Sequence, residues 1–225
     1  MNTDTSAMHE AGPPTTAGLS APASEILPAR SHTRLFLRKL FRQGFSVAAM
    51  KPASKSLAAA HCKHVDATRP QVVVEIGAGT GAVTAAVAQR MHKDSLLIAV
   101  EIDQDFAAIL RERCPRATVL ACDASDLPQH LTSLNVDRID LMISCIALPH
   151  VPRKVNESIF GCLKTMGDGA WFTQQTLVPL VYRRMYHRLF SEVHFRMVFA
   201  NLPPGGVYHC RGLKADYQHH LPGKR

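Results

Sequence analysis

Residues 72–81 read VVVEIGAGTG, an apolar run that gives way to three glycines at alternate positions. Consecutive valines favour a buried β-strand, and the Ala/Val-rich stretch 81–91 that follows favours a helix. Glycines at such a junction let the backbone turn tightly and let a ligand approach it closely. A dinucleotide-binding loop would carry its third glycine at position 82, which is Ala82 here. The stretch therefore predicts a related but different ligand loop, with Glu75 two residues ahead of its first glycine.

Strands and helices alternate from this stretch towards the end of the chain. Such alternation predicts an α/β fold, with a mostly parallel sheet that is covered by helices on both faces. Ligands of these sheets bind at the carboxyl ends of the strands, near the point where the strand order reverses. The expected strands are 71–76, 96–101, 117–121, 139–144, 170–174, 193–200 and 206–210, and the expected helices are 81–91, 104–113, 155–166 and 179–190.

Acidic residues stand at the ends of three successive predicted strands: Glu75, Glu101 and Asp123. Glu101 lies 20 residues past Gly81, where a carboxylate can accept both hydroxyls of a ribose. Asp123, or the backbone beside it, is placed to reach an adenine ring. Three carboxylates would repel a pyrophosphate, so the set favours a nucleoside without phosphates, S-adenosylmethionine rather than NAD or ATP. The alternative is a structural loop of glycines with acids that cap helices.

With these motifs, residues 71–145 resemble the class I S-adenosylmethionine-dependent methyltransferases. Within that family the chain is similar to the branch shared by rRNA adenine dimethyltransferases and small bacterial phospholipid N-methyltransferases. The likeness to the lipid enzymes spans about residues 33–212 and includes FLRKL at 36–40, AAMKPASKSL at 48–57, QQT at 174–176 and NLPP at 201–204. The resemblance implies a Rossmann-like class I methyltransferase fold with a seven-stranded sheet and a basic helical extension at its N-terminus. It also implies S-adenosylmethionine as cofactor, S-adenosylhomocysteine as product, and N-methylation of an aminolipid head group such as phosphatidylethanolamine.

The loop after the fourth strand distinguishes a lipid substrate from an RNA substrate. Adenine dimethyltransferases carry Asn-Leu/Pro-Pro-Tyr/Phe here, and its aromatic ring stacks on the base. This chain reads SCIALPH at 144–150, with no aromatic ring and no paired prolines. RNA base recognition needs such a stacking platform, so an rRNA adenine N6-dimethyltransferase is the alternative rather than the first choice. A non-catalytic binding protein is a third possibility, which the intact glycines and acids disfavour.

The predicted site has a cofactor part and a substrate part. His150 is the candidate base or proton relay, and Tyr208, like Tyr182 and Tyr186, is a candidate ring for an amine that becomes cationic. A surface histidine and core tyrosines are the alternatives. Arg183, Arg184 and Arg188 would bind a lipid phosphate or simply form a solvated helix face. The predicted cofactor contacts are Glu75, Gly77, Gly79, Gly81, Glu101, Ile102, Asp123, Ala124 and Ser144, and the predicted substrate contacts after the strands are Leu148, Pro149 and Asn201.

The net charge of +8 is concentrated near the N-terminus. Residues 30–65 hold eight of the 26 basic residues and no acidic one, which leaves 18 basic against 18 acidic residues elsewhere. Residues 33–43 have helical spacing, with Phe36 and Phe41 on one side and Arg38, Lys39 and Arg42 on the other. A basic amphipathic helix of this kind suits an anionic membrane surface. A core-packing helix with a solvated basic face is the alternative, and nucleic acid is the less favoured partner.

The organisation that follows is a disordered tail at 1–30, a basic amphipathic helical segment at 31–66, the methyltransferase domain at 67–213 and a C-terminal tail at 214–225. No run approaches the roughly 20 apolar residues of a membrane-spanning helix, and the first 29 residues lack the apolar stretch of a secretory signal. We therefore expect a cytoplasmic protein that associates peripherally with the inner face of the cell membrane. His61, Cys62 and His64 form only a partial ligand set, so no metal is expected.

Overall fold

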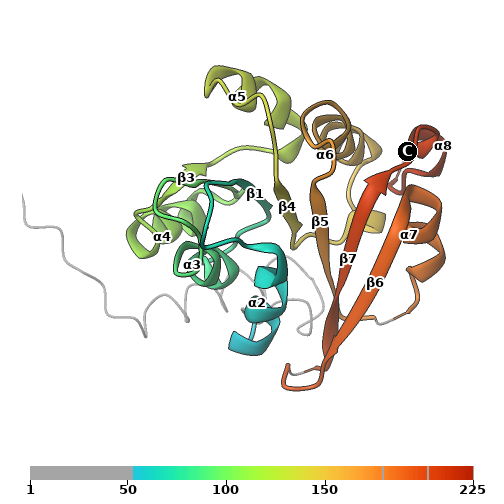
Figure 1. The fold of residues 1–225 in the computed structure, drawn as a ribbon, viewed down its shortest axis with the longest axis horizontal. Coiled ribbons are helices and arrows are strands. Elements are labelled where there is room, and N and C mark those ends of the chain that lie inside the picture. Colours follow the sequence, from blue (N-terminus) through green and yellow to red (C-terminus); the bar gives the residue numbers. More distant parts are fainter. Residues whose placement is uncertain (1–52, 179, 202, 225) are drawn as a thin grey trace, which may run out of the picture.

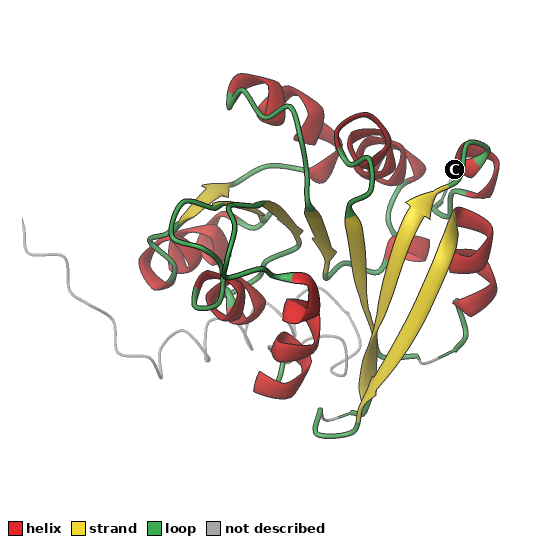
Figure 2. Ribbon diagram, viewed as in Figure 1, coloured by secondary structure: helices red, strands yellow, loops and turns green. Residues whose placement is uncertain are grey.

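The computed structural model describes residues 53–178, 180–201 and 203–224, and it forms one seven-stranded sheet with helices on both faces (Figures 1 and 2). The strand order is β3-β2-β1-β4-β5-β7-β6. The predicted tail at 1–30 and the predicted membrane contacts Phe36, Arg38, Lys39, Phe41 and Arg42 lie outside the described residues.

Five parallel strands form the part of the sheet that carries the predicted ligand loop. The last two strands form a long hairpin that joins β5 through an antiparallel pairing of β5 with β7. The order reverses between β1 and β4, and this switch point is where open α/β sheets bind ligands. The bounds are β1 Val72–Ile76, β2 Leu96–Val100, β3 Ala117–Leu120, β4 Leu141–Ser144, β5 Trp171–Thr176, β6 Phe190–Val198 and β7 Gly205–Leu213.

Helices α2 (Lys55–His61), α3 (Ala82–Ala88) and α4 (Gln104–Arg113) cover one face of the sheet. Ser54 caps α2, since its side chain accepts a hydrogen bond from the Leu57 backbone N–H. Val73, Leu97 and Leu141 point from the sheet towards α2 and α3 and are fully buried there. Because side chains alternate along a strand, Val74 and Met142 belong to the core on the opposite face.

The other face is covered by α5 (Leu127–Ser133), α6 (Arg153–Met166) and α7 (Arg183–Leu189). Phe160 of α6 is buried in this core, and its ring lies 5.4 Å from that of Phe172 of β5 and 6.0 Å from that of Phe190 of β6. Short 3-10 turns lie at Cys62–His64 (η2), Ala124–Asp126 (η3) and Leu148–His150 (η4).

The segment predicted as a C-terminal tail is packed rather than free. It forms α8 (Tyr217–His220), and Tyr217 and Leu221 are buried in the core that contains Phe160. Arg153 also donates hydrogen bonds to the Gln218 and Leu221 carbonyls. Two buried apolar residues and the Arg153 hydrogen bonds thus hold this segment against the sheet domain.

The structure confirms the predicted fold class, a mostly parallel seven-stranded sheet of Rossmann type. Within the described residues, no helix combines the length and apolar character needed to cross a bilayer. The loops at the carboxyl ends of β1, β2, β3 and β4 meet at one edge of the sheet, and this edge carries the candidate site.

Candidate active site

The glycine loop between β1 and α3 has the backbone geometry that its sequence predicts. Gly77, Gly79 and Gly81 have φ values of 75°, 56° and 85°, a region that L-residues rarely adopt. A Cβ on Gly77 would collide with the Ile146 side chain, and one on Gly81 would lie 2.6 Å from Leu110. A Cβ on Gly79 would meet nothing within 4 Å. Gly77 and Gly81 therefore allow close packing, whereas Gly79 faces open space.

Glu101, at the end of β2, holds this loop in place. Its carboxylate accepts hydrogen bonds from the Gly79 backbone N–H at 2.7 Å and from the Asp103 backbone N–H at 3.0 Å. Burial raises the pKa of Glu101, while these two backbone donors act in the opposite direction. Asp103 in turn caps α4 by accepting hydrogen bonds from Asp105 and Phe106. The sequence between β2 and α4 thus fixes the carboxylate beside the glycine loop.

A cavity of about 330 Å³ opens beside Glu101. Six of the nine predicted cofactor contacts line it: Gly77, Gly79, Glu101, Ile102, Asp123 and Ala124. Asp123 also accepts a hydrogen bond from the Ser125 backbone N–H, which fixes the turn after β3. Sequence reasoning missed the other lining residues, which are Ile76, Val100, Phe106, Cys122, Ile146, Val151, Pro152 and Val155.

Glu75, Gly81 and Ser144 do not line this cavity. Glu75 is fully buried on the α3 face of the sheet, where its Oε2 accepts a hydrogen bond from the Thr84 hydroxyl at 2.7 Å. Burial raises the pKa of Glu75 to about 8. Ser144 is fully buried at the end of β4. Glu75 and Ser144 do not reach the cavity, because a side chain inside a strand points to one face of the sheet rather than over its edge.

The cavity suits a nucleoside with a positively charged sulfur. Glu101 and Asp123 present carboxylates at the ends of β2 and β3, and the open side of Gly79 leaves its backbone accessible. The remaining wall is mainly apolar, from Ile76, Val100 and other residues, and can enclose an adenine ring. Within the described residues, the wall contains no Lys or Arg that would recognise a pyrophosphate.

A second cavity, of about 410 Å³, adjoins the first. Ile146 and Val151, from the β4–α6 loop, line both cavities. The second cavity contains the predicted residues Leu148, Pro149 and His150 on one side and Leu177, Val178, Tyr182 and Tyr186 on the other. Its wall is largely apolar, with His150 exposed at the β4–α6 side.

Gln174 fixes the loop that separates the two cavities. Its side-chain NH₂ donates to the Ile146 carbonyl and to the Gln175 carbonyl, each at 2.8 Å. Two carbonyl partners determine which end of the amide carries nitrogen, so Oε1 must point the other way. That oxygen is buried and has no partner among the described residues. The QQT segment at 174–176 thus positions Ile146, although its role had not been predicted.

Two predicted substrate residues lie away from the second cavity. Tyr208 of β7 is fully buried and packs on Tyr186 and Phe195, with ring distances of 4.4 and 4.7 Å. Tyr186, which lines the cavity, therefore stands between Tyr208 and any ligand. Asn201 accepts a hydrogen bond from the Ser54 backbone N–H at 3.2 Å and donates to the Pro203 carbonyl at 2.8 Å. These bonds tie the β6–β7 turn to the start of α2.

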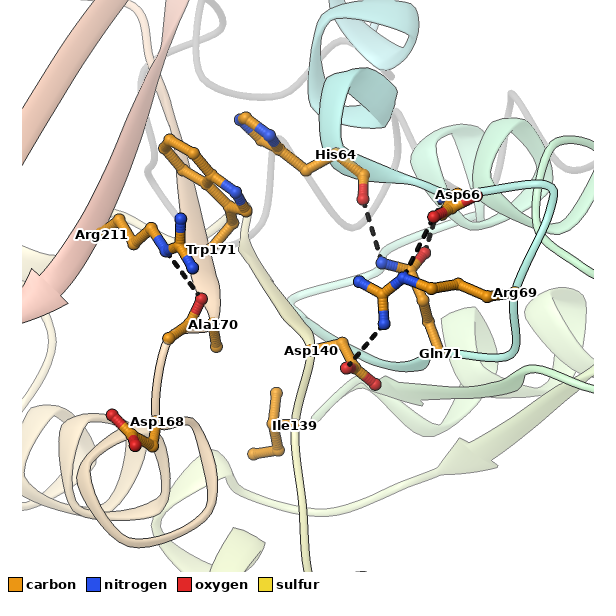
Figure 3. Close-up of a pocket in the computed structure, with 11 residues that line it drawn as sticks. His64, Asp66, Arg69, Gln71, Ile139, Asp140, Asp168, Ala170, Trp171 and Arg211 are labelled. Atoms are coloured by element: carbon orange, nitrogen blue, oxygen red, sulfur yellow. Dashed lines mark hydrogen bonds and ion pairs between the residues drawn. The ribbon is translucent and has the colours of Figure 1, made fainter.

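A third cavity, of about 300 Å³, lies at the opposite edge of the sheet (Figure 3). His64 stacks on Trp171 at a ring distance of 3.8 Å, and the Arg211 guanidinium lies 5.6 Å from the centre of the Trp171 ring. Arg69 pairs with Asp66 and Asp140. The charged groups of this cavity largely satisfy one another, as expected of a structural joint between the amino ends of the strands.

The histidines of the partial metal motif point to different partners. The His61 ring lies 2.9 Å from the Thr173 hydroxyl, and the Cys62 thiol donates to the Ala58 carbonyl. Burial lowers the pKa of His61 to about 3 and that of His209, which is also buried, to about 3. Among the described residues, no group of three or more His, Cys, Asp or Glu is placed to hold a metal ion.

Known proteins share both the sequence and the fold. Residues 73–167 match the family model described as a methyltransferase domain. The chain is 38% identical over 187 residues to ornithine lipid N-methyltransferase of Singulisphaera acidiphila, which covers 81% of this chain and 97% of that protein. It is 35% identical over 88 residues to ribosomal RNA small subunit methyltransferase A of a Hydrogenobaculum species, which covers 39% of this chain and 32% of that protein.

Solved structures share the fold. An O-methyltransferase from Bacillus cereus in complex with SAH superposes with a TM-score of 0.55 at 16% identity, over 83% of this chain and 93% of that one. TomG from Streptomyces achromogenes, in complex with SAM, gives 0.55 at 14% identity, over 81% of this chain and 89% of that one. One conclusion follows from the glycine loop, from Glu101 and Asp123, and from the near full-length similarity to a lipid N-methyltransferase. The chain belongs to the class I S-adenosylmethionine-dependent methyltransferases, in the group that resembles the lipid N-methyltransferases.

Proposed function

We propose that this enzyme transfers methyl groups to the amine of an aminolipid head group, ornithine lipid or phosphatidylethanolamine in type, at the surface of a membrane. The observation that carries the proposal is the apolar cavity that shares Ile146 and Val151 with the cofactor cavity. A methyl acceptor must lie against the donor, and an apolar wall suits the part of a lipid next to its head group. The near full-length similarity to ornithine lipid N-methyltransferase supports the same substrate class.

The reaction needs a neutral nitrogen in line with the methyl donor. S-adenosylmethionine, when bound, supplies a methyl group on a positively charged sulfur. Glu101 and Asp123 would hold the nucleoside, and Ile146 would position the acceptor against it. Positioning of this kind can remove about 7–11 kcal/mol of the barrier to a displacement.

The acceptor amine begins as an ammonium ion, because its ordinary pKa lies well above neutrality. An apolar wall lowers the pKa of such an amine by disfavouring its charged form. We assign His150, exposed on the wall of the acceptor cavity, the role of taking up the released proton. Tyr182 and Tyr186 line the same cavity and can face the nitrogen as it becomes more alkylated. Tyr208 supports Tyr186 from behind.

Peripheral attachment to an anionic membrane, on the cytoplasmic side, forms part of this proposal. The basic segment 30–65 and its Phe36/Phe41 stripe support such attachment. RNA methylation is the competing function, and the partial match to a ribosomal RNA methyltransferase favours it. The loop 144–150 has no Phe, Tyr or Trp for a base to stack on, which favours the lipid.

Lipid analysis tests the proposal directly. The full chain is expressed in a bacterial host that lacks methylated lipids, and extracted lipids are examined by mass spectrometry. We expect aminolipids that are heavier by one or more methyl groups, and their absence from a matched E101A strain. Unchanged lipids together with newly methylated adenines in rRNA would favour the competing function.

A further inference from the structure

Large apolar side chains gather at two loops next to the acceptor cavity. Of the seven that stand exposed among the described residues, five lie in the β5–α7 connection or at the tip of the β6–β7 hairpin. Leu180, Val181 and Phe199 have 56%, 67% and 78% of their surface exposed. Single exposed apolar residues are common, but a concentration of them marks an interaction surface. The residues of this surface, called the rim here, are Val178, Leu180, Val181, Met197 and Phe199.

The two loops of the rim lie at the same edge of the sheet. Thr176, at the end of β5, pairs with Gly206 at the start of β7. A Cβ on Gly205 would lie only 3.1 Å from the Leu177 side chain, so the hairpin turn and the β5–α7 connection are in contact. Figure 1 shows both loops beyond the carboxyl end of β5, on the side away from α5.

The rim is continuous with the acceptor cavity. Leu177 and Val178 line that cavity from within, while Leu180 and Val181, a few residues on, face outwards. A lipid that extends from a bilayer at the rim would therefore bring its head group to the cavity while its acyl chains stay behind.

The charge around the rim has one sign. Residues 177–213 contain five arginines and a single acidic residue, Glu192. Glu192 lies near the far end of β6 from the hairpin tip. Arg183, Arg184 and Arg196 are exposed beside the rim. None of the three is paired with a carboxylate among the described residues.

We propose that the rim docks on an anionic lipid bilayer, with Leu180, Val181 and Phe199 at the acyl boundary and Arg183, Arg184 and Arg196 at the phosphates. This inference rests on the proposed function and names the surface that presents the substrate. Apolar side chains bordered by arginines are the arrangement that binds such an interface. The chain's own basic segment is a poor occupant, since residues 30–65 have eight basic residues and no acidic one and would be repelled.

Tryptophan fluorescence tests the contact. Phe199→Trp and, as the matched control, Leu134→Trp at another exposed apolar position are prepared in the full chain. Vesicles of phosphatidylglycerol and phosphatidylethanolamine with brominated acyl chains are then added. We expect strong quenching of the F199W signal and none for L134W beyond the native Trp171. Equal quenching of both variants would overturn the proposal. Quenching of neither variant, while the protein still binds the vesicles, would also overturn it and would indicate that the rim binds another partner, such as residues 30–65.

A double variant separates this inference from the proposed function. Val181→Glu with Phe199→Glu should weaken binding to the same vesicles at least about tenfold, because it removes apolar area and adds repulsion. Leu134→Glu should leave binding unchanged. Methylation of a short-chain, water-soluble phosphatidylethanolamine should match the wild type in both variants. If the double variant methylates lipid in vesicles as fast as the wild type, the docking role of the rim is rejected and the proposed function stands. If the wild type methylates no aminolipid, the proposed function is rejected.

Discussion

Glu101 Oε2 and the backbone nitrogen of Gly79 are 2.7 Å apart, so the end of β2 is hydrogen-bonded to the ligand loop that follows β1. The same carboxylate lines the cofactor cavity. One side chain therefore both shapes the loop and faces the nucleoside, and its removal should affect binding more than folding.

Glu101→Ala should weaken S-adenosylmethionine binding about 10- to 100-fold, since a hydrogen bond to a charged group contributes about 1.5–3 kcal/mol. Glu101→Gln keeps an acceptor and should lose less. Isothermal titration calorimetry measures both, with thermal unfolding as the control for folding. An affinity for E101A equal to that of the wild type would refute the ribose assignment.

The glycines of the loop should respond differently to alanine. Gly77→Ala must displace Ile146 and adopt an unfavourable φ of 75°, so it should lower both stability and activity. Gly79→Ala has space for its methyl group and should cost only the backbone strain of about 1–2 kcal/mol, but it places that methyl on the open side. We expect urea unfolding to rank G77A below G79A, with cofactor affinity reduced in both. The reverse ranking would contradict the packing of Gly77 on Ile146.

Glu75 should make the protein less stable as the pH rises. Burial raises its pKa in the folded state to about 8, whereas in the unfolded chain the pKa is near its ordinary value of 4.5. The stabilising effect of the protonated form is complete below pH 4.5 and is lost progressively between pH 4.5 and 8. Glu75→Gln should flatten this part of the stability curve, as measured by urea unfolding at a series of pH values. An unchanged slope would show that Glu75 ionises normally.

His61 should act in the opposite direction. Burial lowers its pKa to about 3 from 6.5, so the folded state resists a proton that the unfolded state accepts. Above pH 6.5 His61 is neutral in both the folded and the unfolded state, so it does not change the free energy of unfolding. As the pH falls from 6.5 towards 3, the unfolded state takes up a proton and stability is lost. Each such group changes the free energy of unfolding by up to about 1.4 kcal/mol per pH unit. His61→Asn should reduce the acid-side slope, as measured by urea unfolding at a series of pH values, and an unchanged slope would contradict the burial of a neutral His61.

His150→Ala should lower the turnover number about 100-fold near pH 7, a usual effect of losing a general base. The deficit should shrink at higher pH, where more of the amine is already neutral. Leu134→Ala, far from the cavity, serves as the control. The measurement is a pH–rate profile with the water-soluble aminolipid. A deficit that stays constant with pH would mean that His150 only shapes the cavity.

The chain pattern was enough to predict the sheet and the edge that carries the site. Valines and leucines mark the strands, and their carboxyl ends must share an edge, so Glu101 and Asp123 could be placed together. Helix α5 was missed because its buried positions are few, Leu127 and Leu131, and Pro128 obscures the pattern. The lining from Phe106, Val151 and Val155 depends on how α4 and α6 pack, which local sequence does not encode.

Two further differences come from the sheet itself. Glu75 was predicted to contact the cofactor, but strand alternation places it with Val73 under α3. Tyr208 was predicted to face the substrate, but the pairing of β7 with β5 places it behind Tyr186. The position of Tyr208 depends on the register between distant segments, and the sequence contains no local signal for it.

The partition formed by Ile146 and Val151 has a consequence for how such enzymes diversify. Apart from these two residues, the walls for donor and acceptor are built from separate sets of side chains. Substitutions at Leu177, Val178 or Tyr182 can therefore change which substrate is methylated without altering the binding of the methyl donor. The same separation suggests how to redesign the enzyme. Libraries of variants would change only the residues of the acceptor cavity and leave the donor cavity unchanged.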